Sequence, residues 1–137
     1  MNKVAVVFWS GTGNTEAMAQ AIAKASQGEL FASDAFDAGK VVDYDAFAFG
    51  CPAMGAEELE DSEFAPLFEV CKPALKEKKI ALFGSYGWGD GEWMRTWEED
   101  CDGAGLKRVC DSVICVEAPD GDALAACEKL GRDLAEA

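Results

Sequence analysis

The sequence contains no histidine, so it lacks the side chain most often used as a general base and metal ligand. Basic residues are also scarce, because 12 lysines and arginines stand against 26 aspartates and glutamates and leave a formal charge of −14. This charge disfavours a nucleic-acid partner, since affinity for phosphate backbones comes mostly from cationic side chains. It suits a basic protein partner through electrostatic steering, and the alternative is that the acidity serves solubility alone.

Metal-binding cysteine patterns and long apolar runs are absent as well. No two of the six cysteines are spaced Cys-x-x-Cys, and no zinc or iron–sulfur pattern appears, so a reduced, cytoplasmic chain is the simplest interpretation. The N-terminus lacks a signal-peptide pattern, and no apolar run approaches the ~20 residues of a membrane span. At 137 residues, the chain is expected to form one domain over 1–137.

What the chain does have is a short stretch of small residues after its first apolar run. The run at 4–9 leads into Ser10-Gly11-Thr12-Gly13-Asn14-Thr15, and a helical pattern begins near Glu16. A strand, a glycine turn and a helix start together favour an anion site, because the first helical amides are unpaired and carry partial positive charge. The alternative is a plain strand-to-helix turn with Asn14 or Thr15 as its N-cap.

The same stretch excludes two familiar phosphate sites. It lacks the Gly-Lys-Ser/Thr ending of a P-loop, and it has Glu16 where a dinucleotide fingerprint has its third glycine. It also contains no lysine or arginine. A phosphate bound there would therefore be held by backbone amides and by hydroxyl groups alone.

Apolar runs and helical patterns alternate along the whole chain. Strands are predicted at 4–9, 30–36, 46–51, 80–85 and 109–116, and helices at 16–27, about 62–75, 92 to about 103–105, and 122–136. The mixed run at 30–36 suits a sheet edge, and Pro73 should kink or shorten its helix. This alternation predicts an α/β fold: a doubly wound five-stranded parallel sheet, order 2-1-3-4-5, with helices on both faces.

That strand order brings three irregular loops together. The loops at 10–15, 51–61 and 85–91 follow strands one, three and four, which are neighbours in the sheet. Their shared edge lies beside the switch point between strands one and three, where open α/β sheets bind ligands.

Three segments of the chain resemble those of short-chain flavodoxins, in the same order and at the same strand ends. They are Trp9-Ser10-Gly11-Thr12-Gly13-Asn14-Thr15-Glu16, Gly50-Cys51-Pro52-Ala53-Met54-Gly55-Ala56-Glu57-Glu58-Leu59 and Phe83-Gly84-Ser85-Tyr86-Gly87-Trp88-Gly89. No insertion interrupts 109–116, as one does in long-chain members. The resemblance covers essentially the whole chain and implies FMN bound non-covalently across the three loops.

The resemblance also implies which residues touch the cofactor. They are Ser10, Gly11, Thr12, Gly13, Asn14, Thr15, Pro52, Ala53, Met54, Gly55, Ala56, Glu57, Ser85, Tyr86, Gly87, Trp88 and Gly89. The first six would take the phosphate. Pro52 stands where some relatives carry a phosphate-binding serine, so it supplies no hydroxyl there.

Individual roles in the second and third loops follow from the resemblance in the same way. Met54 would face one side of the isoalloxazine ring, and Trp88 would stack on the other side. Glu57 would accept from flavin N3–H, and amides around Gly89 would serve O2. The alternatives are an ordinary core tryptophan for Trp88 and a solvated acid for Glu57.

The remaining tryptophans are expected elsewhere. Trp93 and Trp97 recur at helical spacing and are predicted to lie in the core. Trp9 is compatible with either a core position or a wall beside the phosphate.

The family also uses the peptide after Gly55 as a switch. On one-electron reduction this peptide flips, and its carbonyl accepts from flavin N5, which stabilises the neutral semiquinone. A Cβ disfavours positive φ, so Ala56 is predicted to bias the turn toward the form with its carbonyl at N5. Carboxylates beside the ring should make the semiquinone/hydroquinone couple strongly negative; they are Glu57, Glu58, Glu60, Asp61, Glu63, Asp90 and Glu92.

Together these features predict a low-potential one-electron carrier, not an enzyme, whose FMN cycles between semiquinone and hydroquinone. It would shuttle electrons between basic-surfaced redox enzymes that dock at the acidic rim around the flavin edge, as a monomer with no membrane partner. The alternative is an FMN-dependent NAD(P)H quinone or nitro reductase, which needs the open flavin face that Trp88 would cover. A phospho-receiver domain is excluded, because strand three ends Phe49-Gly50-Cys51 without an aspartate.

Overall fold

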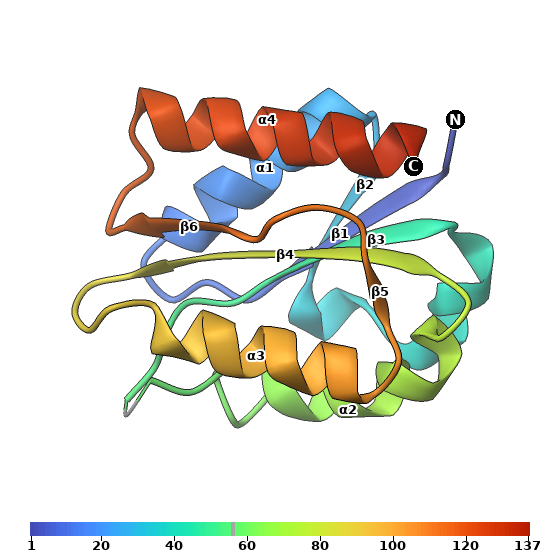
Figure 1. Ribbon diagram of the computed structural model, residues 1–137, viewed down its shortest axis with the longest axis horizontal. Helices are drawn as coiled ribbons and strands as arrows, with labels where there is room; N and C mark the ends of the chain where they lie inside the picture. Colours follow the sequence, from blue (N-terminus) through green and yellow to red (C-terminus); the bar gives the residue numbers. More distant parts are fainter. Residues whose placement is uncertain (56) are drawn as a thin grey trace.

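A parallel sheet in the order β2-β1-β3-β4-β5 organises the molecule, and a sixth strand, β6, also pairs with β4 (Figure 1). The structure is a computed structural model that describes residues 1–55 and 57–137. Its elements are β1 (Val4–Phe8), α1 (Asn14–Ser26), β2 (Glu29–Ala32), η1 (Ser33–Ala35), η2 (Ala38–Asp43), β3 (Ala46–Gly50), α2 (Phe64–Leu75), β4 (Lys79–Tyr86), α3 (Glu92–Gly103), β5 (Lys107–Arg108), β6 (Val113–Val116) and α4 (Gly121–Glu136). The predicted α/β class and strand order are confirmed.

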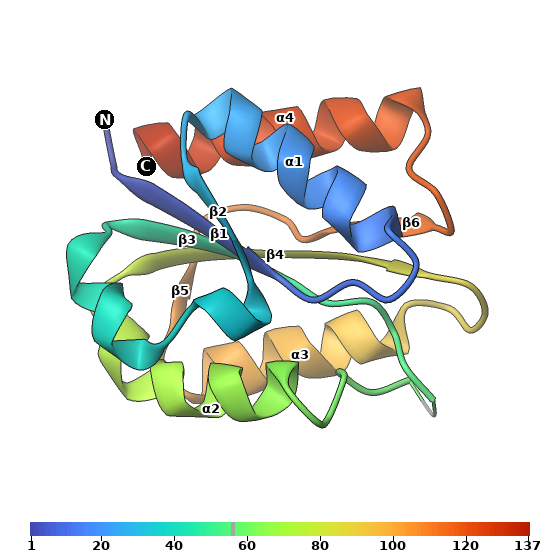
Figure 2. The same ribbon diagram turned by 180° about the vertical axis from the view of Figure 1, so that it is seen from behind.

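Helices cover both faces of the sheet, as predicted. Helices α1 and α4 lie on one face, and α2 and α3 lie on the other (Figures 1 and 2). The central strands β1 and β3 are buried at every position, which is why they read as continuous apolar runs. The weaker strand β2 pairs with β1 alone, so its predicted place at a sheet edge is confirmed.

The two faces are packed differently. The α2/α3 face holds most of the buried aromatic side chains, and Trp97 packs edge-on against Phe64 and Phe68 at centroid distances of 5.5 Å. The core of the α1/α4 face is mainly aliphatic and contains several small residues, and a Cβ on Gly131 would lie 2.7 Å from the backbone oxygen of Ile22. The two helices therefore approach each other closely, and the aromatic bulk supports the loops that follow β3 and β4.

The last strand differs from its prediction. The run at 109–116 was expected to form one strand, but only Val113–Val116 does so, as β6, while the short strand β5 lies before the run at Lys107–Arg108, and both strands pair with β4. Between them, the Ser112 hydroxyl donates to Glu98 Oε2 at 2.6 Å, while Arg108 bonds to Glu98 and to Asp102. The Val109 amide still bonds to the Ile80 oxygen at 3.0 Å, so side-chain bonds to α3 take the place of ladder pairing only over 110–112.

Helix α2 runs through its proline. Pro73 lies inside α2, and the helix ends two residues later, at Leu75.

Within the described residues, no helix has both the length and the apolar character needed to cross a bilayer.

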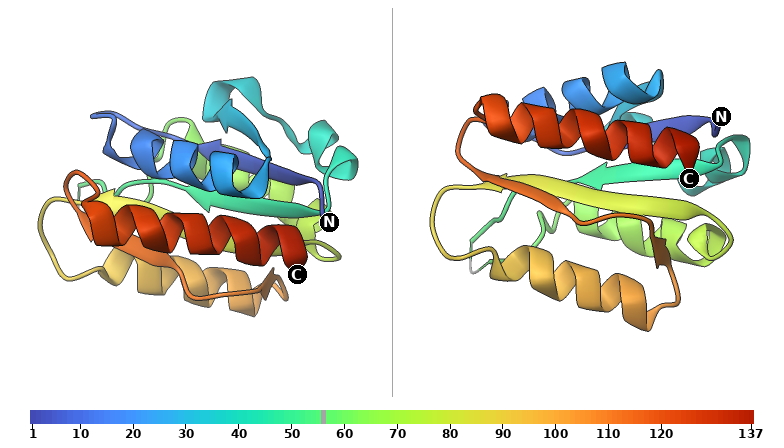
Figure 3. Two further views of the ribbon diagram at one scale, coloured as in Figure 1. Left: turned by 90° about the horizontal axis from the view of Figure 1, so that it is seen from above. Right: turned by 45° about the horizontal axis from the view of Figure 1, so that its top comes forward.

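The two chain ends meet at one end of the sheet, away from the three irregular loops (Figure 3). The backbone amide of Asn2 donates to the Ala135 oxygen at 2.8 Å, and the Asn2 side-chain Nδ2 donates to the backbone oxygens of Leu134 and Ala137. The opposite edge, at the carboxyl ends of the strands, is thus left to the loops.

Candidate functional site

The loops after β1, β3 and β4 meet at the carboxyl edge of the sheet and enclose a cavity of about 660 Å³. Its walls come from Trp9, Gly11, Thr12, Asn14, Pro52, Ala53, Met54, Ser85, Tyr86, Gly87, Glu117 and Ala118. The convergence predicted from the strand order is therefore found, and the volume lies in the range of small-molecule and cofactor pockets.

The first loop is closed by its own hydrogen bonds. The Gly13 amide donates to the Ser10 hydroxyl at 3.0 Å, and the Ala17 amide donates to the Gly13 oxygen at 3.0 Å. Gly13 is itself the N-cap of α1, in the left-handed region at φ 93°, where glycine is favoured. The alternative of Asn14 or Thr15 as the N-cap is wrong, because α1 begins one residue after Gly13, and both lie in its first turn.

A buried hydroxyl pair ties the first loop to the third. Thr15 Oγ1 and Ser85 Oγ are 3.0 Å apart, and the two residues are only 1% and 4% exposed. The bond crosses from the start of α1 to the end of β4, so the first turn of α1 is fixed against the sheet.

The second loop returns on itself beside the cavity. Met54 and Glu58 form an antiparallel bridge, with amide-to-carbonyl distances of 2.8 and 2.9 Å, and the Ala53 amide bonds to the Ser85 oxygen at 3.0 Å. Gly55 has φ 47°, a left-handed value that glycine adopts without steric cost. The prediction made for Ala56 falls on a residue outside the described part of the chain.

Glu57 carries an unusual oxygen. Its backbone is left-handed, at φ 59°, and its side-chain Oε1 is buried without a hydrogen-bond partner among the described residues. A Cβ placed on Gly89 would overlap this same oxygen, so the carboxylate lies against the backbone of the third loop. A buried acceptor without a donor is costly, which makes Oε1 a position that an N–H group could satisfy.

The third loop exposes its aromatic side chain. Trp88 is 66% exposed, so the alternative of a core tryptophan is wrong. Trp93 and Trp97, by contrast, are 1% and 2% exposed, and their predicted core positions are confirmed. Trp9 is half-buried against the aromatic core and also lines the cavity, so it combines the two positions considered for it.

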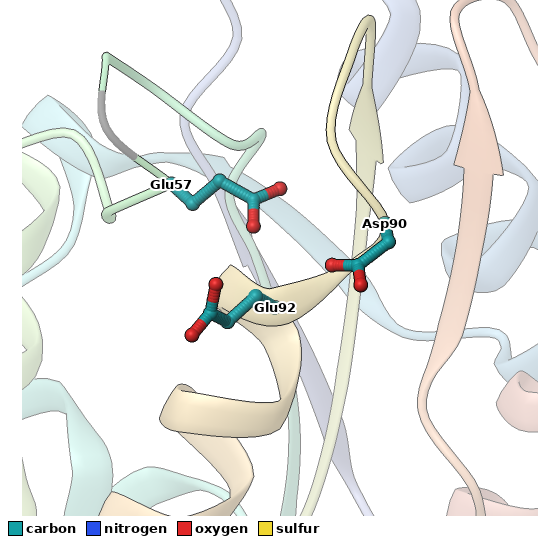
Figure 4. A group of neighbouring side chains, drawn as sticks. All are labelled: Glu57, Asp90 and Glu92. Atoms are coloured by element: carbon teal, nitrogen blue, oxygen red, sulfur yellow. The ribbon is translucent and has the colours of Figure 1, made fainter.

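Three carboxylates face one another beside the second and third loops. Glu57, Asp90 and Glu92 each place an oxygen within 4.8 Å of the other two (Figure 4). Arg95 donates to Asp90 Oδ1 at 3.0 Å, whereas no ion pair involves Glu57 or Glu92 in the described part of the chain. The sequence had placed Asp90 and Glu92 across the proposed site from Glu57, whereas the structure brings the three carboxylates together, and the group disfavours further negative charge nearby.

The predicted site residues fall into two sets. Those lining the cavity are Gly11, Thr12, Asn14, Pro52, Ala53, Met54, Ser85, Tyr86 and Gly87. Those in the same loops but not in its wall are Ser10, Gly13, Thr15, Gly55, Glu57, Trp88 and Gly89, and Ala56 is not described.

Sequence reasoning missed a fourth contribution to the cavity wall. Glu117 and Ala118 follow β6 and line the cavity, with the Glu117 amide bonded to the Tyr86 oxygen at 2.7 Å. The predicted strand order could have indicated these two residues, because β6 ends at the same carboxyl edge of the sheet as β1, β3 and β4.

Comparisons with known proteins agree on one family. The family model described as Flavodoxin matches residues 6–131. Flavodoxin from Megasphaera elsdenii is 46% identical over 139 residues, covering 98% of this chain and 99% of the relative, and flavodoxin from Clostridium beijerinckii is 43% identical, covering 95% and 97%. The solution structure of two-electron reduced Megasphaera elsdenii flavodoxin superposes with a TM-score of 0.89 over 98% of this chain and 99% of that one.

Proposed function

Because the chain belongs to the flavodoxin family, it is an electron carrier with bound FMN, and we propose that the FMN lies across the three loops at the carboxyl edge of the sheet. The proposed contacts are the seventeen residues named from the sequence. The observation that carries the proposal is a cavity lined by the start of α1 and by the second and third loops, together with a buried Glu57 oxygen on the second loop that has no hydrogen-bond partner among the described residues.

The first loop fits a phosphate. The left-handed N-cap at Gly13 opens α1 at Asn14, so the first helical amides remain free for an anion. Hydroxyls of Ser10 and Thr12 lie in the same loop, which contains no cation. The loop is therefore suited to hold the FMN phosphate by amides and hydroxyls, as the sequence predicted.

The second and third loops fit a flat, partly polar ring. Met54 and Tyr86 give the cavity an apolar wall, and Trp88 is exposed in the adjoining loop. Glu57 Oε1 has no donor among the described residues, and the N3–H group of a flavin has the chemistry to supply one. We assign Met54 and Trp88 to the two faces of the ring, and Glu57 to its N–H edge.

FMN supplies reversible one-electron chemistry when bound. The group Glu57, Asp90 and Glu92 places three carboxylates beside the proposed ring position, and Asp90 forms an ion pair with Arg95. Like charge at this distance raises the free energy of any added negative charge. The carboxylates therefore support a carrier that works at low potential.

The acidic surface also supports the proposed partner class. A formal charge of −14 and the carboxylates around the loops would attract redox proteins with basic surfaces, in a salt-sensitive and short-lived complex. We propose that the protein acts there as a monomeric carrier and not as an enzyme. Its six free cysteines favour a reducing compartment such as the cytoplasm.

Titration of the apoprotein with FMN tests this function. We expect 1:1 binding and, on stepwise reduction of the complex, two separated one-electron steps. The purified protein should not oxidise NAD(P)H in the steady state. Absence of FMN binding would contradict the site, and rapid NAD(P)H oxidation would favour the reductase alternative.

A further inference from the structure

Glu60 is a buried carboxylate that the proposed function does not use. It is 6% exposed, although it lies in the second loop and within the acidic run 57–63. A charge is buried at tolerable cost only when hydrogen bonds replace its water. The bonds that Glu60 makes therefore indicate what it does.

All donors to the Glu60 carboxylate belong to the start of α2. The amides of Ser62, Glu63 and Phe64 donate at 2.9, 2.8 and 2.8 Å, and the Ser62 hydroxyl donates as well. Phe64 is the first residue of α2, whose N-cap, Glu63, provides no capping side chain of its own. Glu60 thus caps α2 from outside the helix, satisfying amides that would otherwise be unpaired.

These bonds also keep the carboxylate ionised. Burial alone would raise the pKa of Glu60, but the bonds from Ser62, Phe64 and Glu63 outweigh it and lower this pKa below the usual value for glutamate. Within residues 1–55 and 57–137, no lysine or arginine forms an ion pair with Glu60. The negative charge is held by the start of α2 alone.

The backbone of Glu60 is tied to the start of the second loop. Its amide donates to Cys51 Sγ at 3.3 Å. Cys51 is fixed in turn, because its amide bonds to the Phe83 oxygen at 3.2 Å and its oxygen accepts from Trp93 Nε1 at 3.1 Å. A Cβ on Gly84 would overlap the Cys51 oxygen, so β4 approaches this residue closely.

We propose that Cys51 and Glu60 form a clamp at the base of the loop segment 51–60. This clamp positions Met54 and Glu57 for the flavin ring, and Glu60 is the positioning residue that acts through its carboxylate. This inference rests on the proposed function. The clamp fastens both ends of the segment 51–60, inside which the Met54–Glu58 bridge returns the chain on itself. Neither clamp residue lines the cavity, so the clamp acts on FMN only through the residues it holds.

Removal of the Glu60 carboxylate should lower the affinity for the flavin ring and leave the affinity for phosphate unchanged. In Glu60→Gln, the side-chain NH₂ group meets backbone N–H groups, and at most one acceptor oxygen remains for four donors. The matched control is Asp61→Asn, which removes a neighbouring charge from an exposed side chain that makes no hydrogen bond in the described part of the chain. Both variants lose one negative charge, so a difference between them reports position and not charge.

The experiment measures the affinity of each apoprotein for three probes: FMN, lumiflavin, which is the ring without ribityl phosphate, and inorganic phosphate. We expect Glu60→Gln to bind FMN and lumiflavin roughly tenfold to a hundredfold more weakly, with phosphate binding unchanged. Asp61→Asn should stay within about twofold of wild type for all three. Hydrogen exchange of apo Glu60→Gln should show faster exchange at the amides of 62–64.

Several outcomes would overturn the clamp. One is a wild-type lumiflavin affinity in Glu60→Gln despite faster exchange at 62–64, and another is an equal loss in Asp61→Asn. If Glu60→Gln does not fold, Ser62→Ala removes only the hydroxyl donor and must show the same selective loss at smaller size. Failure of wild-type apoprotein to bind FMN overturns the proposed function together with the clamp, whereas equal FMN affinities in wild type and variants overturn the clamp alone.

Discussion

The first loop and the two ring loops (the second and third) are built on opposite principles. In the first loop, Gly13 bonds to Ser10, and the buried hydroxyl of Thr15 bonds to Ser85. In the ring loops, Trp88 is 66% exposed, and Glu57 has a buried oxygen without a partner in the described residues. The first loop is held in shape by its own hydrogen bonds and leaves helix amides free for an anion, whereas the ring loops leave an exposed indole and a buried acceptor without a partner in the described residues.

This difference assigns separate tasks to the two regions. A preformed loop loses little conformational entropy on binding, so the first loop is suited to supply affinity. The ring loops carry carboxylates beside the proposed ring position, and Glu57 would gain a hydrogen-bond donor there only from the ring, so these loops are suited to set the potential. Perturbing each region should therefore change different measured quantities.

The largest effect should come from removing the phosphate from the ligand. Riboflavin has the same ring as FMN but offers nothing to the first loop, so several charge-assisted hydrogen bonds are lost. We expect wild-type apoprotein to bind riboflavin at least roughly 1000-fold more weakly than FMN, about 4 kcal/mol. Fluorescence titration measures both constants. Equal affinities would show that the first loop is an ordinary strand-to-helix turn.

The next largest effect should come from Trp88→Ala. Loss of aromatic stacking on a planar ring costs about 1–3 kcal/mol, so FMN and riboflavin should both bind roughly tenfold to hundredfold more weakly. Because Trp88 is exposed in the structure, the thermal unfolding of the apoprotein should not change. Val116→Ala is the control, since Val116 is 57% exposed at the same sheet edge but lies outside the proposed contacts. A destabilised Trp88→Ala apoprotein would show that the indole packs in the protein.

A smaller effect, of a different kind, should follow Glu57→Gln. Neutralising this carboxylate removes repulsion from Asp90 and Glu92, so the free energy of unfolding of the apoprotein should rise or stay constant. The potential of the second one-electron step should become less negative by ~40 mV, which corresponds to about 1 kcal/mol. Spectroelectrochemistry of the FMN complex measures this shift. Glu92→Gln, with an exposed carboxylate in the same group, should shift the potential in the same direction but less; an unchanged potential in both variants would contradict the electrostatic explanation.

The contrast between the regions also explains how far the sequence could predict them. The buried strands and the loop convergence were predictable, because β1 and β3 are apolar at every position and the strand order then fixes the edge. The break at 110–112 was not, because it depends on Ser112 and Arg108 bonding to Glu98 on α3. Tertiary bonds of this kind leave no periodic signal.

The acidic run 57–63 shows the same limit at the site. Its five acidic residues look alike in the sequence, and all five were expected to act on the ring as nearby charges. The structure turns Glu60 inward onto α2, whereas Glu63 accepts from the Ser33 hydroxyl. Which acid faces inward depends on where the helix amides point, and a run of like charges does not encode that.

The smallest effect should appear under acid, and it separates the regions most clearly. The pKa of Glu60 is lowered in the folded protein, so its stabilising contribution is complete above the unfolded value of about 4.3 and is lost as pH falls through the lower folded pKa. Below that pH the amides of 62–64 should exchange faster in the wild-type apoprotein. In Glu60→Gln they should exchange fast at every pH.

The first loop at 10–15 contains no titratable side chain, so protection of the Gly13 and Ala17 amides should persist through the same acid range until global unfolding. Hydrogen exchange at several pH values below 5, corrected for intrinsic rates, measures both regions in one sample. Simultaneous loss of protection in both would mean that they open as one cooperative unit, and the division of tasks between them would then be wrong.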